Sequence, residues 1–225
     1  METMTNTTQA GGWLGPAAFV ALGATAVSGA ALLLLHGLSP EFAPSWRMVS
    51  EYANGRSRWL LTVVFAGWAI SSFALTAALR PLSASTLGTI GLLFLLLAGV
   101  GQTMGGLFDI NHPLHGPAAM IGIPSLCVAA VLVTIALSRH AGIDAPPTWS
   151  AHLPWISFVI MLGAFALFVS SLKAAGVDMA GQNRPLAELP AGVSGYVGWA
   201  NRLLFAASYL WTVLASLSVL KASAG

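Results

Sequence analysis

The sequence predicts an all-α membrane protein, a bundle of six transmembrane helices with a short interfacial helix after the first. Two observations lead to this prediction. The 225-residue chain is 56% hydrophobic and only 7% charged, and nearly all its ionisable residues fall in the breaks between six long apolar runs. Each run is near or above the ~20 residues that cross ~30 Å of hydrocarbon. The runs are residues 13–38, 59–79, 86–108, 116–137, 153–172 and 197–220.

Helical structure follows from the chemistry of the bilayer core. Because no water is available there, each run must satisfy its backbone groups internally, and the alternating pattern of a barrel strand is absent. The runs occupy almost the whole chain, so we expect one transmembrane domain, residues 1–225. Residues 1–12 contain no Lys or Arg, and the first run exceeds the ~7–15 apolar residues of a signal peptide. We therefore expect it to remain as the first helix.

The break after the first run predicts the short interfacial helix. Pro44 can open it and Gly55 can close it. One interpretation places this helix on the membrane surface, with Arg47 and Glu51 as an ordinary i,i+4 pair. The other places it in the mouth of the bundle, with Glu51 and Tyr52 directed at a cavity.

The break between the third and fourth runs holds Asp109, His112 and His115. Carboxylate and imidazole suit zinc or iron, so one hypothesis is a metal site made by these three residues. A second is that the break only caps the next helix and lies at the membrane interface. A third is a proton-handling group, in which histidine sets the charge of the neighbouring carboxylate.

Further polar residues lie within or beside the apolar runs. Gln102 lies two turns before Asp109, and Asn201 and Arg202 open the last run. Arg202 should either reach lipid headgroups or meet a carboxylate, and Glu51 or Asp109 could be that partner. We expect Glu51, Asp109 and Arg202 at the same membrane boundary, because an even number of crossings puts their segments on one side.

Short motifs spread along most of the chain carry a resemblance. They are His36-Gly-Leu-Ser-Pro-Glu41, Ser50-Glu-Tyr-Ala53, Gly106-Leu-Phe-Asp109, His115-Gly116 and Asn201-Arg202. Together they resemble a family of small six-helix prokaryotic membrane proteins catalogued as a domain of unknown function. That resemblance implies the fold and no activity. In size and carboxylate chemistry the chain is also similar to small integral-membrane terpene cyclases.

We predict a membrane-embedded enzyme that acts on a lipidic, isoprenoid substrate in a cyclase-like reaction. In a dry cavity a carboxyl group favours its protonated form and can act as general acid, so Glu51 and Asp109 are the predicted catalytic residues. No cofactor is expected. The predicted substrate-binding residues are Tyr52, Arg56, Trp59, Gln102, His112, His115, Trp199, Asn201 and Arg202.

Two alternatives remain open at this point. One is a metal-dependent lipid hydrolase that uses Asp109, His112 and His115. The other is a transporter or lipid-binding protein without chemistry. The expected partners are the bilayer and a hydrophobic ligand, not nucleic acid, and the oligomeric state stays open.

Membrane orientation follows from the basic residues. Six Lys and Arg fall in the breaks on the site side and three on the side of the termini. The positive-inside rule therefore predicts a cell-membrane protein whose site-bearing loops face the cytoplasm.

Overall fold

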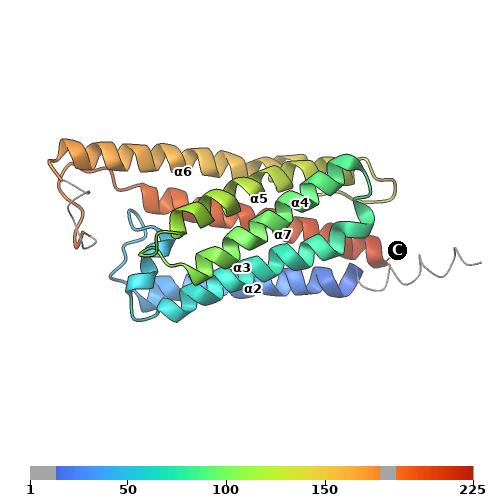
Figure 1. Ribbon diagram of the computed structural model, residues 1–225, viewed down its shortest axis with the longest axis horizontal. Helices are drawn as coiled ribbons and strands as arrows, with labels where there is room; N and C mark the ends of the chain where they lie inside the picture. The colour runs from blue at the N-terminus through green and yellow to red at the C-terminus, as the bar shows by residue number, and fades with distance from the viewer. Residues whose placement is uncertain (1–13, 178–185, 225) are drawn as a thin grey trace, which may run out of the picture.

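The computed structural model describes residues 14–177 and 186–224, and it confirms the predicted all-α bundle (Figure 1). Six helices in this part of the chain are long and apolar enough to cross a membrane. The protein is therefore a multi-pass membrane protein. The helices are α2 (Leu14–Leu38), α3 (Arg58–Leu79), α4 (Thr86–Leu107), α5 (His115–Ser138), α6 (Thr148–Ala174) and α7 (Val197–Ala224).

The helix ends differ from the predicted runs mainly in α6 and α7. Helix α6 begins at Thr148 instead of residue 153, and α7 continues to Ala224 instead of ending at residue 220. Polar residues such as Ser150 and His152 end the apolar run, but the helix and its backbone hydrogen bonds continue through them to Thr148. Trp13, the first residue of the first predicted run, lies outside the described residues.

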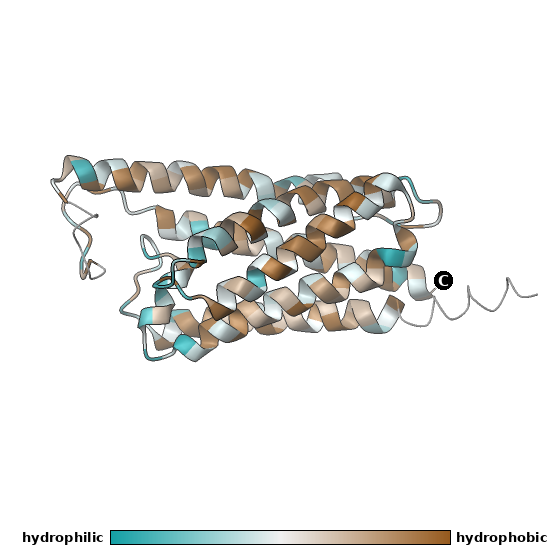
Figure 2. Cartoon of the chain, viewed as in Figure 1, coloured by the Kyte–Doolittle hydropathy of each residue, from teal (hydrophilic) through white to brown (hydrophobic). Residues whose placement is uncertain are grey.

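Helices that follow one another in the chain pack side by side, and α2 also packs against α7. The C-terminus and the start of α2 lie at one end of the bundle, and the breaks after α2, α4 and α6 lie at the other (Figure 1). We call this second end the mouth. Hydrophobic residues line the helices along their length, whereas hydrophilic residues gather at the two ends (Figure 2).

Small residues let the helices approach closely. A Cβ atom added at Gly101 of α4 would collide with the backbone of Gly122 in α5. This contact allows the two backbones to touch, as small-residue pairs do in membranes. Deeper in the bundle, the fully buried Trp211 donates its indole N–H to Thr134 Oγ1 at 3.1 Å, so its polar atom is satisfied.

The short helix predicted after the first transmembrane helix is present as the 3₁₀ helix η1 (Val49–Asn54), and a second 3₁₀ turn, η2 (Arg80–Leu82), follows α3. Val49 and Tyr52 are buried, and η1 contacts α3 and α7. The segment therefore lies over the mouth, as in the second of the two interpretations of this break, and we call residues 45–54 the cover. Glu51 nevertheless pairs with Arg47, as in the first interpretation, and neither Glu51 nor Tyr52 lines the pocket described below.

Candidate functional site

Arg202, in the second turn of α7, is the centre of a buried hydrogen-bond network at the mouth. The residue is only 8% exposed. Its Nε donates to His36 Nε2 at 2.6 Å, and its Nη2 donates to the Tyr52 hydroxyl at 3.0 Å. Its Nη1 donates to the carbonyl oxygens of Arg47 at 2.6 Å and Gly198 at 3.1 Å. The network therefore joins α2, the segment after it and the last helix.

No carboxylate takes part in this network. The sequence predicted Glu51 or Asp109 as the partner of Arg202, and this prediction is wrong, because all the acceptors of its guanidinium are neutral groups. The ion pairs among the described residues involve Arg47 and Lys221 instead. Because His36 Nε2 accepts from Arg202, the proton of the neutral ring lies on Nδ1, which donates to the carbonyl of Leu32 at 2.6 Å. His36 thus orients the guanidinium without compensating its charge.

Glu51 makes its contacts within its own segment. Its Oε2 accepts from Arg47 Nη1 at 2.6 Å, and its Oε1 accepts from the backbone N–H of Met48 at 2.8 Å. Arg47 lies over the ring of Trp46, 4.0 Å from its centroid, and donates to the carbonyl of Leu186. Glu51 therefore shapes the cover of the mouth, and its carboxylate has a donor at each oxygen.

The start of α7 is tied to the same cover. Ser45 O accepts from the backbone N–H groups of Gly198 at 2.8 Å and Trp199 at 3.2 Å, which are helix-end donors without partners in the helix itself. In return, the Asn201 carboxamide oxygen accepts from Val49 N–H at 2.9 Å. These bonds fix the position of η1 above the bundle.

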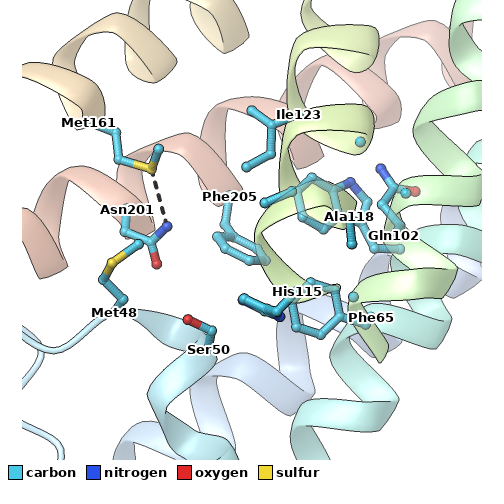
Figure 3. A pocket seen from close by; sticks show the side chains of 15 residues that line it. Met48, Ser50, Phe65, Gln102, His115, Ala118, Ile123, Met161, Asn201 and Phe205 are labelled. Carbon is cyan, nitrogen blue, oxygen red and sulfur yellow. Dashed lines mark hydrogen bonds between the residues drawn. The ribbon is translucent and has the colours of Figure 1, made fainter. Parts of the chain in front are cut away.

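Beneath η1 lies a pocket of about 630 Å³, including its open side (Figure 3). Most of its wall is apolar or aromatic. The rings of Trp68 and Phe205, 4.7 Å apart, are part of this wall. The polar side chains that line it are Ser50, Gln102, His115 and Asn201.

These polar groups are not equally available. The Gln102 carboxamide, oriented to satisfy both its ends, accepts from Trp68 Nε1 at 3.2 Å and donates to Ser72 Oγ at 2.8 Å. His115 uses Nδ1 to donate to the carbonyl of Phe108 at 2.9 Å, which leaves Nε2 without a hydrogen-bond partner in the described part of the chain. Gln102 is therefore a structural link, whereas His115 can bind a ligand in the pocket.

Asp109 and His112 lie outside this pocket. Both are exposed; Asp109 Oδ1 accepts from the backbone N–H of Asn111, and His112 stacks on Phe108 with ring centroids 4.5 Å apart. Within residues 14–177 and 186–224, no three His, Cys, Asp or Glu side chains gather in a way that could hold a metal ion. The geometry thus gives no support to a metal site at Asp109, His112 and His115.

The remaining predicted binding residues lie at the rim. Trp59 is 62% exposed and Trp199 is 55% exposed. Trp59 lines a second, outward-facing hollow together with Asp109. Arg56 is exposed and lines none of the pockets described here. The structure therefore brings Tyr52, Asn201 and Arg202 together under the cover, and places Trp59, Asp109, Trp199 and Arg56 outside it.

Sequence reasoning left His36 and Met161 out of the candidate binding residues. His36 lies near the end of the first run, on the same side of the membrane as Arg202, so the sequence could have predicted it as a partner of Arg202. Met161 lines the pocket, and its sulfur accepts from Asn201 Nδ2 at 3.4 Å. Nothing in the sequence distinguishes Met161 from a lipid-facing methionine of α6.

No family model, curated protein or solved structure matches the chain. The resemblance to the six-helix family therefore stays a prediction, and the functional argument depends on the site itself.

Proposed function

We propose that the protein binds one lipidic molecule, a chain of isoprenoid type with a small polar end, in the pocket beneath η1. The observation behind this proposal is the distribution of polar groups. Ser50, His115 and Asn201 all belong to the mouth end, while Gln102 below them is engaged by the protein. A mainly apolar cavity with a few convergent polar groups is the usual form of a small-molecule site.

The polar end of the ligand would lie at the mouth, and its chain would extend toward Trp68 and Phe205. A hydroxyl there could donate to His115 Nε2 and accept from Ser50, whereas aromatic faces suit an unsaturated hydrocarbon. We place this mouth at the cytoplasmic face of the cell membrane, on the count of Lys and Arg residues.

Acid–base conversion of that ligand is a second candidate, and one observation favours it. His115 is the ionisable side chain among those lining the pocket, and its free Nε2 could take or give a proton. Glu51 and Asp109, the acids predicted from the sequence, do not line the pocket. The cyclase-like reaction therefore remains a hypothesis in which His115 would transfer the proton.

A photoreactive farnesol analogue tests ligand binding in the purified, detergent-solubilised protein. Ala119 lines the pocket in α5, so Ala119→Phe should fill the space and reduce labelling at least ~10-fold. Val128 is an outward-facing residue of the same helix, 37% exposed, and Val128→Phe should label as the unmutated protein does. Crosslinked peptides should come from α5 and the start of α7.

Equal labelling of the two variants would show that the probe binds elsewhere and would remove the proposal. For the second candidate, His115→Gln should retain labelling but lose conversion of farnesol-type substrates by roughly 10²-fold, the lower end for a general acid or base. Conversion at the unmutated rate would exclude His115 as the proton-transfer group.

A further inference from the structure

Two adjoining hollows lie on the outer face of α3 and α4. The hollow nearer the mouth encloses about 720 Å³ and the deeper one about 510 Å³, each including its open side. Thr62, Gly106 and Leu107 line both. They therefore form one continuous feature, which we call the α3–α4 groove.

The two ends of this groove differ in chemistry. Arg58, Trp59 and Asp109 line the mouth end, while Ile70 and Phe73 line the deep end. From Arg58 to Phe73 the helix advances about 22 Å, at ~1.5 Å per residue. One leaflet of a ~30 Å hydrocarbon core is about 15 Å thick. The groove is thus long enough for the headgroup and one acyl chain of a lipid in a single leaflet.

The charges at the mouth end are available to a ligand. Arg58 and Asp109 line the same hollow but form no ion pair, since the pairs among the described residues are Arg47–Glu51 and Lys221–Asp144. Asp109 accepts one backbone N–H through Oδ1, and no hydrogen bond from the described residues reaches Oδ2 or the Arg58 guanidinium. The Arg58 guanidinium and the Asp109 carboxylate, each able to form further hydrogen bonds, therefore line one hollow.

We propose that the α3–α4 groove binds a phospholipid with a primary-amine headgroup of the ethanolamine type. The phosphate would lie at Arg58, whose planar guanidinium can donate two parallel bonds, and the ammonium would donate to Asp109. Trp59 would lie at headgroup level, where indoles are enriched. The acyl chain would follow the groove toward Phe73. The groove shares Phe65 and Gly105 as wall residues with the pocket beneath η1, but Arg58 and Asp109 line the groove and not that pocket. The proposal does not depend on the proposed function.

Both charges are needed for the choice of headgroup. A choline headgroup has the same net charge but no N–H donor for Asp109. A glycerol headgroup leaves Asp109 facing a net anion, which is repulsive. The arrangement therefore favours ethanolamine over choline and glycerol when the acyl chains are identical.

Native mass spectrometry of the full chain in detergent tests this proposal with dioleoyl phosphatidylethanolamine, phosphatidylcholine and phosphatidylglycerol. The ethanolamine lipid should bind roughly 10-fold more tightly than the other two, a ratio that one charge-assisted hydrogen bond can provide. Asp109→Asn should abolish its advantage over the choline lipid. Arg58→Gln should weaken binding of both zwitterionic lipids.

Matched controls come from the opposite end of the bundle. Arg80 and Asp144 are an exposed arginine and an exposed aspartate there, and Arg80→Gln and Asp144→Asn should leave lipid selectivity unchanged. Equal binding of the three lipids to the unmutated protein would overturn the proposal, as would selectivity that survives both groove variants. Tighter binding of the glycerol lipid would also overturn the proposal and would indicate a site for anionic headgroups instead. Labelling of the inner pocket by the farnesol analogue should be unaffected by Arg58→Gln, so the two proposals can fail separately.

Discussion

Replacing His36 by leucine should destabilise the protein, because it removes the acceptor of the bond from Arg202 Nε. That bond is 2.6 Å long and joins α2 to α7, and Arg202 is 8% exposed. A hydrogen bond with a charged partner contributes about 1.5–3 kcal/mol, and a buried donor left unsatisfied has a comparable cost. We therefore expect the free energy of unfolding to fall by roughly 1.5–3 kcal/mol, which corresponds to about 10- to 150-fold in the unfolding equilibrium.

The measurement is equilibrium unfolding in mixed micelles, followed by the fluorescence of the tryptophans. His140→Leu is the matched control, since His140 is exposed at the opposite end of the bundle and, among the described residues, its ring bonds only to the neighbouring carbonyl of Ala141. It should change stability by less than about 0.5 kcal/mol. His36→Gln should recover part of the loss, because a carboxamide oxygen can accept from Arg202. If His36→Leu and His140→Leu unfold alike, the network around Arg202 does not stabilise the fold.

Two further predictions concern the cover and the helix contacts. Glu51→Gln breaks the largely buried pair with Arg47 and should reduce the free energy of unfolding by roughly 1–3 kcal/mol. Asp144→Asn breaks the pair with Lys221, whose side chains are 71% and 67% exposed, and should change the free energy of unfolding by less than about 1 kcal/mol. The same unfolding assay measures both, and equal effects would contradict the structural role of Glu51. Gly101→Ala should separate α4 from α5 and lower the thermal transition measured in detergent. Gly163→Ala in α6, where an added Cβ meets nothing within 4 Å, should instead raise stability by about 0.4–1 kcal/mol. Unchanged melting of Gly101→Ala would show that the α4–α5 contact is not tight.

The fold could be predicted from the sequence because hydropathy is a local property. Each apolar run has to become a helix wherever it lies in the bundle, so the number of helices could be predicted from the number of runs. The start of α6 could not be predicted in this way, since Ser150 and His152 interrupt the apolar run without interrupting the backbone hydrogen bonds of Thr148–Ala174.

The site was predictable only in its local parts. Arg47 and Glu51 are four residues apart, and their pairing could be read from the spacing. His36 and Arg202 are separated by most of the chain, and topology placed them on one side without indicating that they touch. Charge attraction predicted a carboxylate partner for Arg202. Glu51 instead pairs with Arg47, four residues away, and Asp109 lines the hollow on the outer face of α3 and α4.

The bonds between the cover and α7 impose an order on biogenesis. Val49 and Tyr52 leave the ribosome 152 and 150 residues before their partners Asn201 and Arg202, and Ser45 likewise precedes its partner Gly198. Until α7 enters the membrane, the segment after α2 lacks its hydrogen bonds to α7, and His36 and Tyr52 have no guanidinium to bind. A chain that stalls after five helices would therefore display an open, polar mouth within the bilayer. Insertion of α7 is thus the step at which quality control can distinguish a closed mouth from an open one.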